Sequence, residues 1–262
     1  MSVLSYSLIN QNLNKMEPTK NRLLNIGTNM LLLSFIMIMT SFQILQNEQK
    51  PEPETTKEIV QGVYSINDTF VRLFAIHDTD GYIVVDAGAN ADSIATELKK
   101  VQIDPSNVKA VFLTHTHRDH IAALKLFKNA HIYLAANELE NLNGEKPASL
   151  KLGNEIYPNT FSFLKDQEII RFKTVNVRAI FTPGHSLGST SFVVNGKYLF
   201  VGDALSLVNG KIDKPNPAYT KDMKMAFQSF DKIKNLPNVK YIFTAHTGYT
   251  DNYKNAVDTQ LK

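Results

Sequence analysis

Four metal-type ligands lie within six residues of the chain, in the sequence THTHRDH at residues 114–120. They are His115, His117, Asp119 and His120. Neutral imidazoles and ionised carboxylates are the nitrogen and oxygen ligands that Zn²⁺ takes. Because the apolar run 109–113 precedes them, we expect these ligands to leave the end of a buried strand in a loop that turns inward. The alternative is a polar loop that happens to be rich in histidine.

Three further ligand-type residues follow apolar, strand-like runs later in the chain. His185 follows the run 175–181, Asp203 ends the segment LFVGD, and His246 ends the segment YIFTAH. Sheets in α/β proteins bind their ligands at strand ends, so one edge of a sheet system is expected to carry a single site. Three protein ligands per metal would leave a coordination position open for water. Asp203 taken alone would fit an ordinary turn residue.

In this order the ligands resemble those of the metallo-β-lactamase superfamily, and the resemblance covers residues 58–248. It implies an α/β fold, the four-layer αβ/βα sandwich, and two Zn²⁺ or other divalent ions. By that resemblance, one metal is held by His115, His117 and His185, and the second by Asp119, His120 and His246. Asp203 would bridge the two metals. Asp86, in the segment IVVDAG, would brace the histidine loop by hydrogen bonds without binding metal.

The implied function is a dinuclear zinc-dependent hydrolase of a small-molecule substrate. A metal-bound hydroxide would attack the carbonyl of a small ester, thioester, lactone or amide. Asp119 is the candidate catalytic residue, because it can ligate a metal and orient the nucleophile. Tyr219 and Tyr249 are candidates to stabilise the oxyanion, and a structural role is the alternative for each.

Several branches of the superfamily fit the sequence only in part. An exported β-lactamase is one alternative, but the β-lactamases with this histidine motif usually lack a bridging aspartate. Glyoxalase II enzymes carry a helical glutathione-binding domain, whereas only residues 247–262 follow His246 here. Acyl-homoserine lactonases place a tyrosine where this chain has Ser206. A redox enzyme of the superfamily, with iron and a flavin domain, is a further alternative that fits this chain poorly. The non-enzymatic alternative is a tethered metal- or partner-binding module on the same fold.

Composition narrows the possible partners and cofactors. The 262 residues carry a net charge of +3 with no basic stripe, so a nucleic-acid partner is not expected. The chain has no cysteine, which excludes disulfides and zinc–thiolate ligation. His77 and His131, the two remaining histidines, are expected to be ordinary strand-end residues.

The N-terminal 57 residues differ in composition from the rest. Residues 1–45 combine basic residues with the apolar run MLLLSFIMIM, which indicates a signal peptide or a membrane anchor. Residues 46–57 are polar and proline-bearing, as is typical of a flexible linker. The hydrolase domain would then occupy residues 58–262 and be exported: periplasmic, secreted or membrane-anchored, outside the cytosol. The alternative is a buried helix of a cytosolic protein.

The elements that must position the ligands alternate between strands and helices. Expected strands are 58–66, 69–76, 82–85, 108–113, 131–134, 168–172, 175–181, 191–194, 198–201 and 239–243. Expected helices are 92–101, 119–128, 136–142 and 221–233, and the polar segment 143–158 is expected to be a surface loop. In the last helix, Met225, Phe227, Phe230 and Ile233 are core candidates. Periodicity by itself predicts only a mixed α/β protein.

Overall fold

The computed structural model describes residues 55–139 and 149–259. The expected signal or anchor at 1–45 and nearly all of the linker at 46–57 therefore lie outside the described residues. Within the described ranges, every helix is too short or too polar to cross a bilayer.

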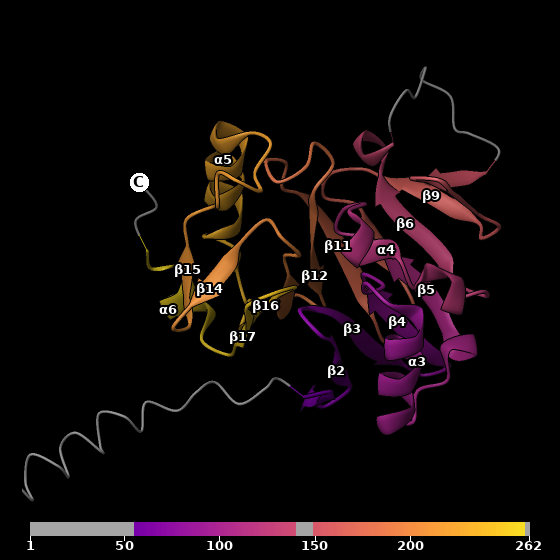
Figure 1. Cartoon of the computed structure of the whole chain (residues 1–262). Coiled ribbons are helices and arrows are strands. Elements are labelled where there is room, and N and C mark those ends of the chain that lie inside the picture. Colours follow the sequence, from indigo (N-terminus) through magenta and orange to yellow (C-terminus); the bar gives the residue numbers. More distant parts are fainter. Residues whose placement is uncertain (1–54, 140–148, 260–262) are drawn as a thin grey trace, which may run out of the picture. The chain divides into compact units, whose positions relative to one another are not determined.

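The first sheet has seven strands in the order β1-β2-β3-β4-β5-β6-β9. Their bounds are β1 Lys57–Val60, β2 Val63–Asp68, β3 Val71–Asp78, β4 Gly81–Val85, β5 Val108–Phe112, β6 His131–Ala135 and β9 Phe161–Leu164. The first four strands pair antiparallel, and β4, β5, β6 and β9 run parallel. Parallel neighbours need a crossover, which α3 (Ala91–Lys100) provides between β4 and β5. The first sheet therefore aligns the carboxyl ends of β4, β5 and β6 along one edge (Figure 1).

The second sheet has six strands in the order β10-β11-β12-β13-β16-β17. Their bounds are β10 Ile169–Arg171, β11 Asn176–Phe181, β12 Thr190–Val194, β13 Tyr198–Phe200, β16 Tyr241–Thr244 and β17 Gly248–Thr250. β13 and β16 are parallel and are joined through α5 (Met223–Ile233). A small hairpin of β14 (Ser206–Val208) and β15 (Lys211–Asp213) follows β13, and α6 (Tyr253–Val257) follows β17.

The two sheets pack face to face between two helical layers (Figure 1). Successive side chains on a strand point to opposite faces, so Val85 and Phe112 enter the core between the sheets while Val84 and Val111 pack on the α3 side. In the core between the sheets, the rings of Phe112 and Phe192 lie 5.3 Å apart. On the far side of the second sheet, residues of α5 and α6 close a third cluster. The expected four-layer αβ/βα sandwich is confirmed.

The helix expected at 119–128 is much shorter in the structure. α4 spans only Arg118–Ile121, and a 3₁₀ turn follows at Leu124–Leu126. The carbonyl of His120 accepts from the backbone N–H of Ala87 at 2.7 Å. This tertiary bond takes the acceptor that would continue the helix. Ile121, Leu124 and Phe127 are nevertheless buried, as expected.

Other expected elements also need correction. Part of the surface loop expected at 143–158 is a hairpin, with β7 (Leu150–Leu152) paired to β8 (Glu155–Tyr157). Of the helix expected at 136–142, the described residues form only a 3₁₀ turn at Ala136–Glu138. In α5, Met225 is exposed, and Ala226 and Ser229 are buried together with Phe230 and Ile233. Alanine and serine contribute little to an apolar pattern, so the buried face predicted from the sequence is rotated slightly about the helix axis from the face that is buried in the structure.

Candidate metal centre

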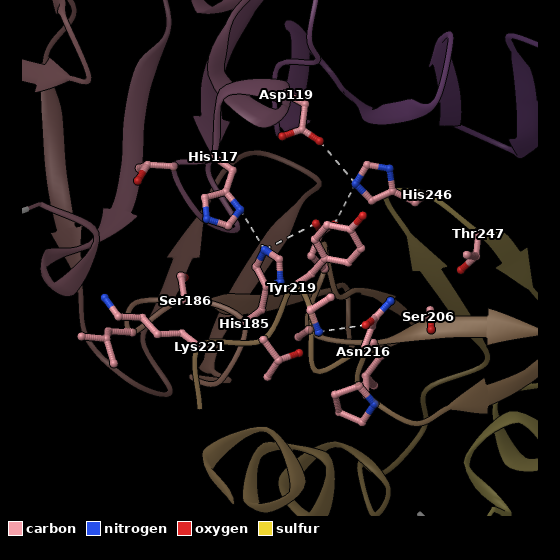
Figure 2. Close-up of a pocket in the computed structure, with 18 of the residues that line it drawn as sticks. His117, Asp119, His185, Ser186, Ser206, Asn216, Tyr219, Lys221, His246 and Thr247 are labelled. Atoms are coloured by element: carbon pink, nitrogen blue, oxygen red, sulfur yellow. Dashed lines mark hydrogen bonds and ion pairs between the residues drawn. The ribbon is translucent and has the colours of Figure 1, made fainter. Parts of the chain in front are cut away.

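The seven expected ligands come together from both sheets. His115 and His117 lie in the loop after β5, and Asp119 and His120 lie in α4. The other three ligands follow strands or lie between strands of the second sheet: His185 between β11 and β12, Asp203 after β13, and His246 after β16. Figure 2 shows His117, Asp119, His185 and His246 facing one common space.

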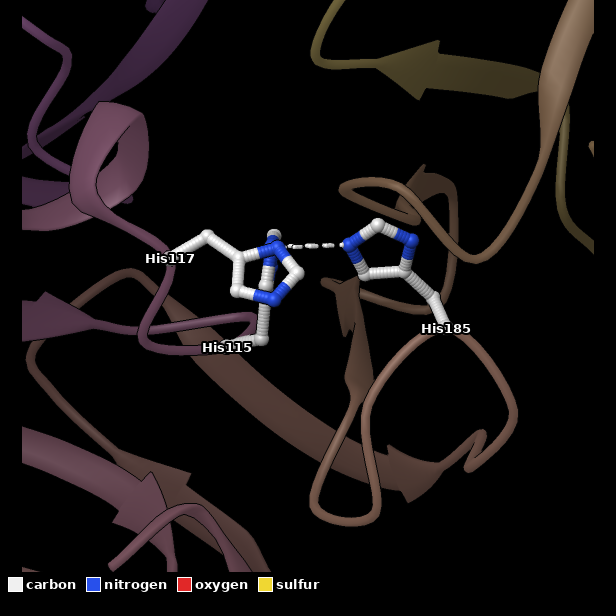
Figure 3. A group of neighbouring side chains, drawn as sticks. All are labelled: His115, His117 and His185. Atoms are coloured by element: carbon white, nitrogen blue, oxygen red, sulfur yellow. Dashed lines mark hydrogen bonds between the residues drawn. The ribbon is translucent and has the colours of Figure 1, made fainter. Parts of the chain in front are cut away.

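Three imidazoles form the first ligand group, His115, His117 and His185. Nε2 of His185 lies 3.1 Å from Nε2 of His115 and 2.9 Å from Nδ1 of His117. Figure 3 shows the three rings directing these nitrogens toward one another. Burial and the neighbouring His120 hold the pKa of His115 well below its ordinary value. A buried, neutral imidazole offers its lone pair to a cation.

The second ligand group is Asp119, His120 and His246. Oδ2 of Asp119 lies 3.6 Å from Nε2 of His120 and 3.4 Å from Nε2 of His246. The hydrogen bond from His246 lowers the pKa of Asp119, so this carboxylate is ionised at neutral pH. One carboxylate and two imidazoles make a donor set that suits a second divalent ion.

Asp203 lies between the two groups and turns one oxygen toward each. Its Oδ2 is 3.5 Å from Nε2 of His185 and 4.0 Å from Nε2 of His115. Its Oδ1 is 3.4 Å from Nε2 of His120 and 3.2 Å from Nε2 of His246. This is the arrangement expected of a bridging carboxylate.

The donor atoms fit a pair of divalent ions on two further observations. Nε2 of His120 and Oδ1 of Asp203 are buried without a hydrogen-bond partner, although buried polar atoms are nearly always paired. In each three-residue group, the donor atoms lie within 4.8 Å of one another. A cation in each group would take up these lone pairs.

Electrostatics at the centre also favours cations. Burial alone would lower the pKa of His120, but the carboxylates of Asp86 and Asp203 raise it to about 10. Burial would likewise lower the pKa of His246, but Asp119 and Asp203 raise it to about 10. Of these carboxylates, Asp203 lies 3.4 Å from Nε2 of His120 and 3.2 Å from Nε2 of His246, so it would stabilise positive charge where a metal would replace the proton.

Contacts outside the ligand set orient the rings. Asp86, held at a backbone φ of 61°, accepts from the backbone N–H of Thr114 at 2.8 Å and lies 2.9 Å from Nδ1 of His120. Nδ1 of His246 lies 2.8 Å from the carbonyl oxygen of Phe70. In both rings Nε2 is left to face the centre, and such contacts fix the tautomer and direction of a ligand.

The centre opens into a cavity of about 1210 Å³. Tyr219 lines this cavity and is well exposed. Tyr249 is not among the lining residues, and its ring stacks on Phe243 at 5.7 Å, so of the two candidate tyrosines only Tyr219 is placed to meet a substrate. His77 and His131 contact Tyr82 and Thr160 respectively, which is consistent with their expected structural role.

Two residues of the site were missed by sequence reasoning. Glu138 bonds to both histidine loops, and Phe70 stacks on His246 with ring centroids 6.0 Å apart. Glu138 stands three residues after the end of β6, so its position after a strand was the available signal. Phe70 lies in the turn between β2 and β3, and nothing local to that turn points to the site.

A family model described as the metallo-beta-lactamase superfamily matches residues 62–246. The chain belongs to the metallo-beta-lactamase superfamily. The expected membership and the expectation of a hydrolase are confirmed.

Two curated relatives illustrate the sequence similarity. A "probable metallo-hydrolase" of Methanocaldococcus jannaschii is 30% identical over 169 residues, which cover 63% of this chain and 71% of that protein. A hydroxyacylglutathione hydrolase of Photobacterium profundum is 31% identical over 190 residues, covering 71% of this chain and 65% of the relative. The match thus spans slightly less than two thirds of the second relative's length.

Two solved structures illustrate the similarity of fold. A metallo-beta-lactamase family protein of Thermus thermophilus gives a TM-score of 0.58 at 22% identity, covering 77% of this chain and 78% of that one. The Rm3 metallo-beta-lactamase gives a TM-score of 0.57 at 18% identity, covering 74% of this chain and 78% of that one. At these identities the likeness concerns the fold.

Proposed function

We propose that this metallo-hydrolase is a dinuclear zinc enzyme that hydrolyses small acyl thioesters, with esters and lactones as chemically related substrates. One observation carries the proposal: Asp203 turns separate oxygens toward two groups of three ligands at a cavity. Two divalent ions at such a centre would supply Lewis acidity and lower the pKa of a shared water. Asp119, Tyr219 and the apolar side chains of the cavity wall would place the substrate around that chemistry.

Asp119 is the residue that we propose to orient the nucleophile. It lines the cavity and is partly exposed, whereas His120 beside it is fully buried. Its ionised carboxylate can accept a hydrogen bond from an attacking water and thereby direct the oxygen lone pair at the carbonyl carbon. Tyr219 is the phenol placed to donate a hydrogen bond to the developing oxyanion.

The nature of the leaving group favours a thioester over an amide. Each histidine that lines the cavity belongs to a ligand group, and Glu138 accepts hydrogen bonds, so none of these is a free general acid. The remaining donors, Tyr219 and Lys221, would be engaged by the oxyanion and by an anionic group of the substrate. A thiol with an ordinary pKa of about 8.5 can depart as an anion. An amine must be protonated as it leaves, which would require a dedicated acid.

The cavity wall favours an apolar acyl group. Four well-exposed apolar or aromatic side chains line it, namely Phe70, Leu187, Val208 and Tyr219. Exposed apolar side chains that gather around one pocket mark a binding surface. Lys221 adds a positive charge that suits an anionic group on the substrate.

The curated relatives support hydrolysis of a thioester bond. Several of them are hydroxyacylglutathione hydrolases, with identities of 26–31%. Because 35–40% of the length of those proteins lies outside the match, we take from them the bond that is cleaved and not the glutathione moiety.

The test is a substrate panel on purified full-length protein with its zinc content measured by mass spectrometry. The panel holds chromogenic acetyl, butyryl and octanoyl thioesters, matching esters, a homoserine lactone and nitrocefin. We expect two zinc ions per chain and the highest kcat/KM on a thioester. Preference for nitrocefin would instead indicate a β-lactamase, and two zinc ions without any turnover would indicate a binding module.

We also propose export of the domain. The proposal rests on the basic and apolar pattern of residues 1–45. Fusion of residues 1–57 to a reporter that is active only outside the cytosol tests it, because reporter activity is expected with the natural segment and should vanish when the run MLLLSFIMIM is replaced by polar residues. No reporter activity from the fusion that carries the natural segment would contradict export.

A further inference from the structure

The carboxylate of Glu138 joins the two loops that carry the first ligand group. Its Oε2 accepts from the backbone N–H and the hydroxyl of Thr116, at 2.7 and 2.8 Å. Its Oε1 accepts from the hydroxyl of Ser186 at 2.5 Å and from the N–H of Gly188 at 2.9 Å. One carboxylate thus directs each of its oxygens to a different ligand loop.

Those loops belong to different sheets. Thr116 stands between His115 and His117, in the loop that leaves β5 of the first sheet. Ser186 follows His185, in the loop between β11 and β12 of the second sheet. Glu138 itself follows β6, the neighbour of β5. The carboxylate therefore connects the two halves of the sandwich beside the first ligand group.

Packing at Gly188 independently shows how closely Glu138 fits against this loop. A Cβ atom added to Gly188 would lie 2.7 Å from both the backbone nitrogen and Oε1 of Glu138, and 2.8 Å from its Cγ. These separations are well inside van der Waals contact. Only glycine at position 188 leaves room for Glu138 as it stands.

The role of Glu138 differs from that of Asp86. Asp86 contacts Thr114 and His120, and so braces ligands that come from one loop of the first sheet. Glu138 has its hydrogen bonds with Thr116, Ser186 and Gly188, none of which is a ligand, and it fixes the distance between two loops instead. Nδ1 of His117 and Nε2 of His185 lie on these two loops and are 2.9 Å apart.

We propose that Glu138 is a positioning residue that sets the metal affinity of the first ligand group, His115, His117 and His185, without setting that of the second. The inference rests on the proposed dinuclear centre. Two ligands held on separate sheets must be ordered before they can share an ion, and the carboxylate supplies that order in advance. Loss of Glu138 would leave the second group, Asp119, His120 and His246, with its own supports.

Glutamine cannot replace Glu138 in this role. All four of its partners are hydrogen-bond donors. An amide has one acceptor oxygen, and its NH₂ group could donate to the nearby hydroxyl but could not accept from the backbone N–H that it would also face. Glu138→Gln should therefore release one of the two loops while keeping almost the same side-chain volume.

The experiment titrates zinc into metal-free, full-length Glu138→Gln, Glu138→Ala and Gly188→Ala, with the metal content followed by competition against a chromogenic chelator. We expect one of the two ions to bind about 10- to 100-fold more weakly in all three variants, and the other to bind as in the wild type. Excess zinc should restore kcat, since the ligands themselves remain. Glu58→Gln is the matched control, because Glu58 is exposed and accepts from the N–H of Gly62, in a strand turn away from the ligand loops.

Three outcomes would overturn the inference. Wild-type affinity for both ions in folded Glu138→Gln and Gly188→Ala would show that the connection between the loops has no effect on metal binding. Equal weakening of both ions would show a general structural effect. A wild-type protein that binds no metal would remove the proposed dinuclear centre, and with it the role of Glu138. Metal binding is measured apart from turnover, so a wrong substrate assignment would leave this inference standing.

Discussion

The carboxylate of Asp86 lies 2.9 Å from Nδ1 of His120, and Nε2 of the same ring is buried in the centre without a hydrogen-bond partner. The contact assigns the ring proton to Nδ1 and leaves the Nε2 lone pair for a cation. Asp86 also accepts from the N–H of Thr114. One buried carboxylate thus supports both the backbone and a ligand ring of the histidine loop.

Asp86→Asn should weaken binding of one zinc ion by about 10- to 100-fold. Asparagine tolerates the positive φ at this position, so the variant is expected to fold. Its amide can still accept from Thr114, but it loses the charge that favours the protonated Nδ1 of His120. Zinc titration measures the effect, with the exposed Asp251→Asn as the control. Unchanged affinity for both ions would contradict this role of Asp86.

His115→Ala and Asp203→Ala should each reduce turnover to the uncatalysed background without unfolding the protein. His115 supplies Nε2 to the first group, and Asp203 supplies an oxygen to each group. The three hydrophobic clusters contain neither residue, so the core should persist. Steady-state kinetics measures the loss of turnover, and circular dichroism checks that each variant remains folded. Wild-type activity in both variants would falsify the dinuclear hydrolase.

Removal of metal should abolish activity and lower the melting temperature, with recovery when zinc is restored. Ions that bind only the folded state stabilise it by about 2.7 kcal/mol at a hundredfold excess over the dissociation constant. The chain should nevertheless remain folded without metal, because its core clusters are apolar and separate from the centre. Calorimetry with and without chelator measures the shift, and an identical melting temperature would argue against bound metal.

Asp78→Ala should destabilise the domain by about 1–3 kcal/mol near neutral pH. Oδ1 of Asp78, at the end of β3, accepts from the N–H and hydroxyl of Thr174, both at 2.7 Å. Thr174 lies between β10 and β11, so this contact links the first sheet to the second. Burial alone would raise the pKa of Asp78, but the bonds from Thr174 lower it overall.

The pH dependence of that stabilisation follows from the lowered pKa. A carboxyl group with a depressed pKa in the folded state stabilises above its unfolded pKa of about 3.9, and the effect is lost as the pH falls. The difference in unfolding free energy between wild type and Asp78→Ala should therefore shrink below about pH 4. Urea unfolding across pH 3–7 measures it. Thr174→Ala is the companion variant and should show the same pH dependence. If the difference in unfolding free energy between wild type and Asp78→Ala grew on acidification, the pKa of Asp78 would be raised and not lowered in the folded state.

Phe70→Ala should lower kcat/KM by about tenfold for an octanoyl thioester and less for an acetyl thioester. The ring is 59% exposed and lies parallel to His246 beside the cavity. The contact to Nδ1 of His246 uses the backbone carbonyl of Phe70, so it survives the substitution. Ile156→Ala is the control, since Ile156 is 66% exposed but does not line the cavity. An equal loss across chain lengths would exclude an acyl-binding role.

The ligand types and their places after apolar runs could be read from the sequence, because strand periodicity and strand ends are local properties. The order of these ligands produced a resemblance that implied the sandwich and the seven converging residues, from His115 to His246, whereas periodicity alone predicted only a mixed α/β protein. Local pattern was less successful where tertiary bonds compete, as at His120, whose carbonyl bonds to Ala87 and ends α4 early. It also missed the short hairpins β7–β8 and β14–β15, which offer few residues for any period to show.

Only the tertiary structure decided which atoms face one another. Three contacts arise only when the two sheets pack. Asp203 directs one oxygen to each ligand group, and Glu138 accepts hydrogen bonds from loops 22 and 50 residues away. The ring of Phe70 stacks on His246. Such contacts join residues that share no local pattern, so their geometry depends on the docking of whole layers. The donor chemistry of the centre is therefore written in the local sequence, whereas its geometry comes from the packing of the sheets.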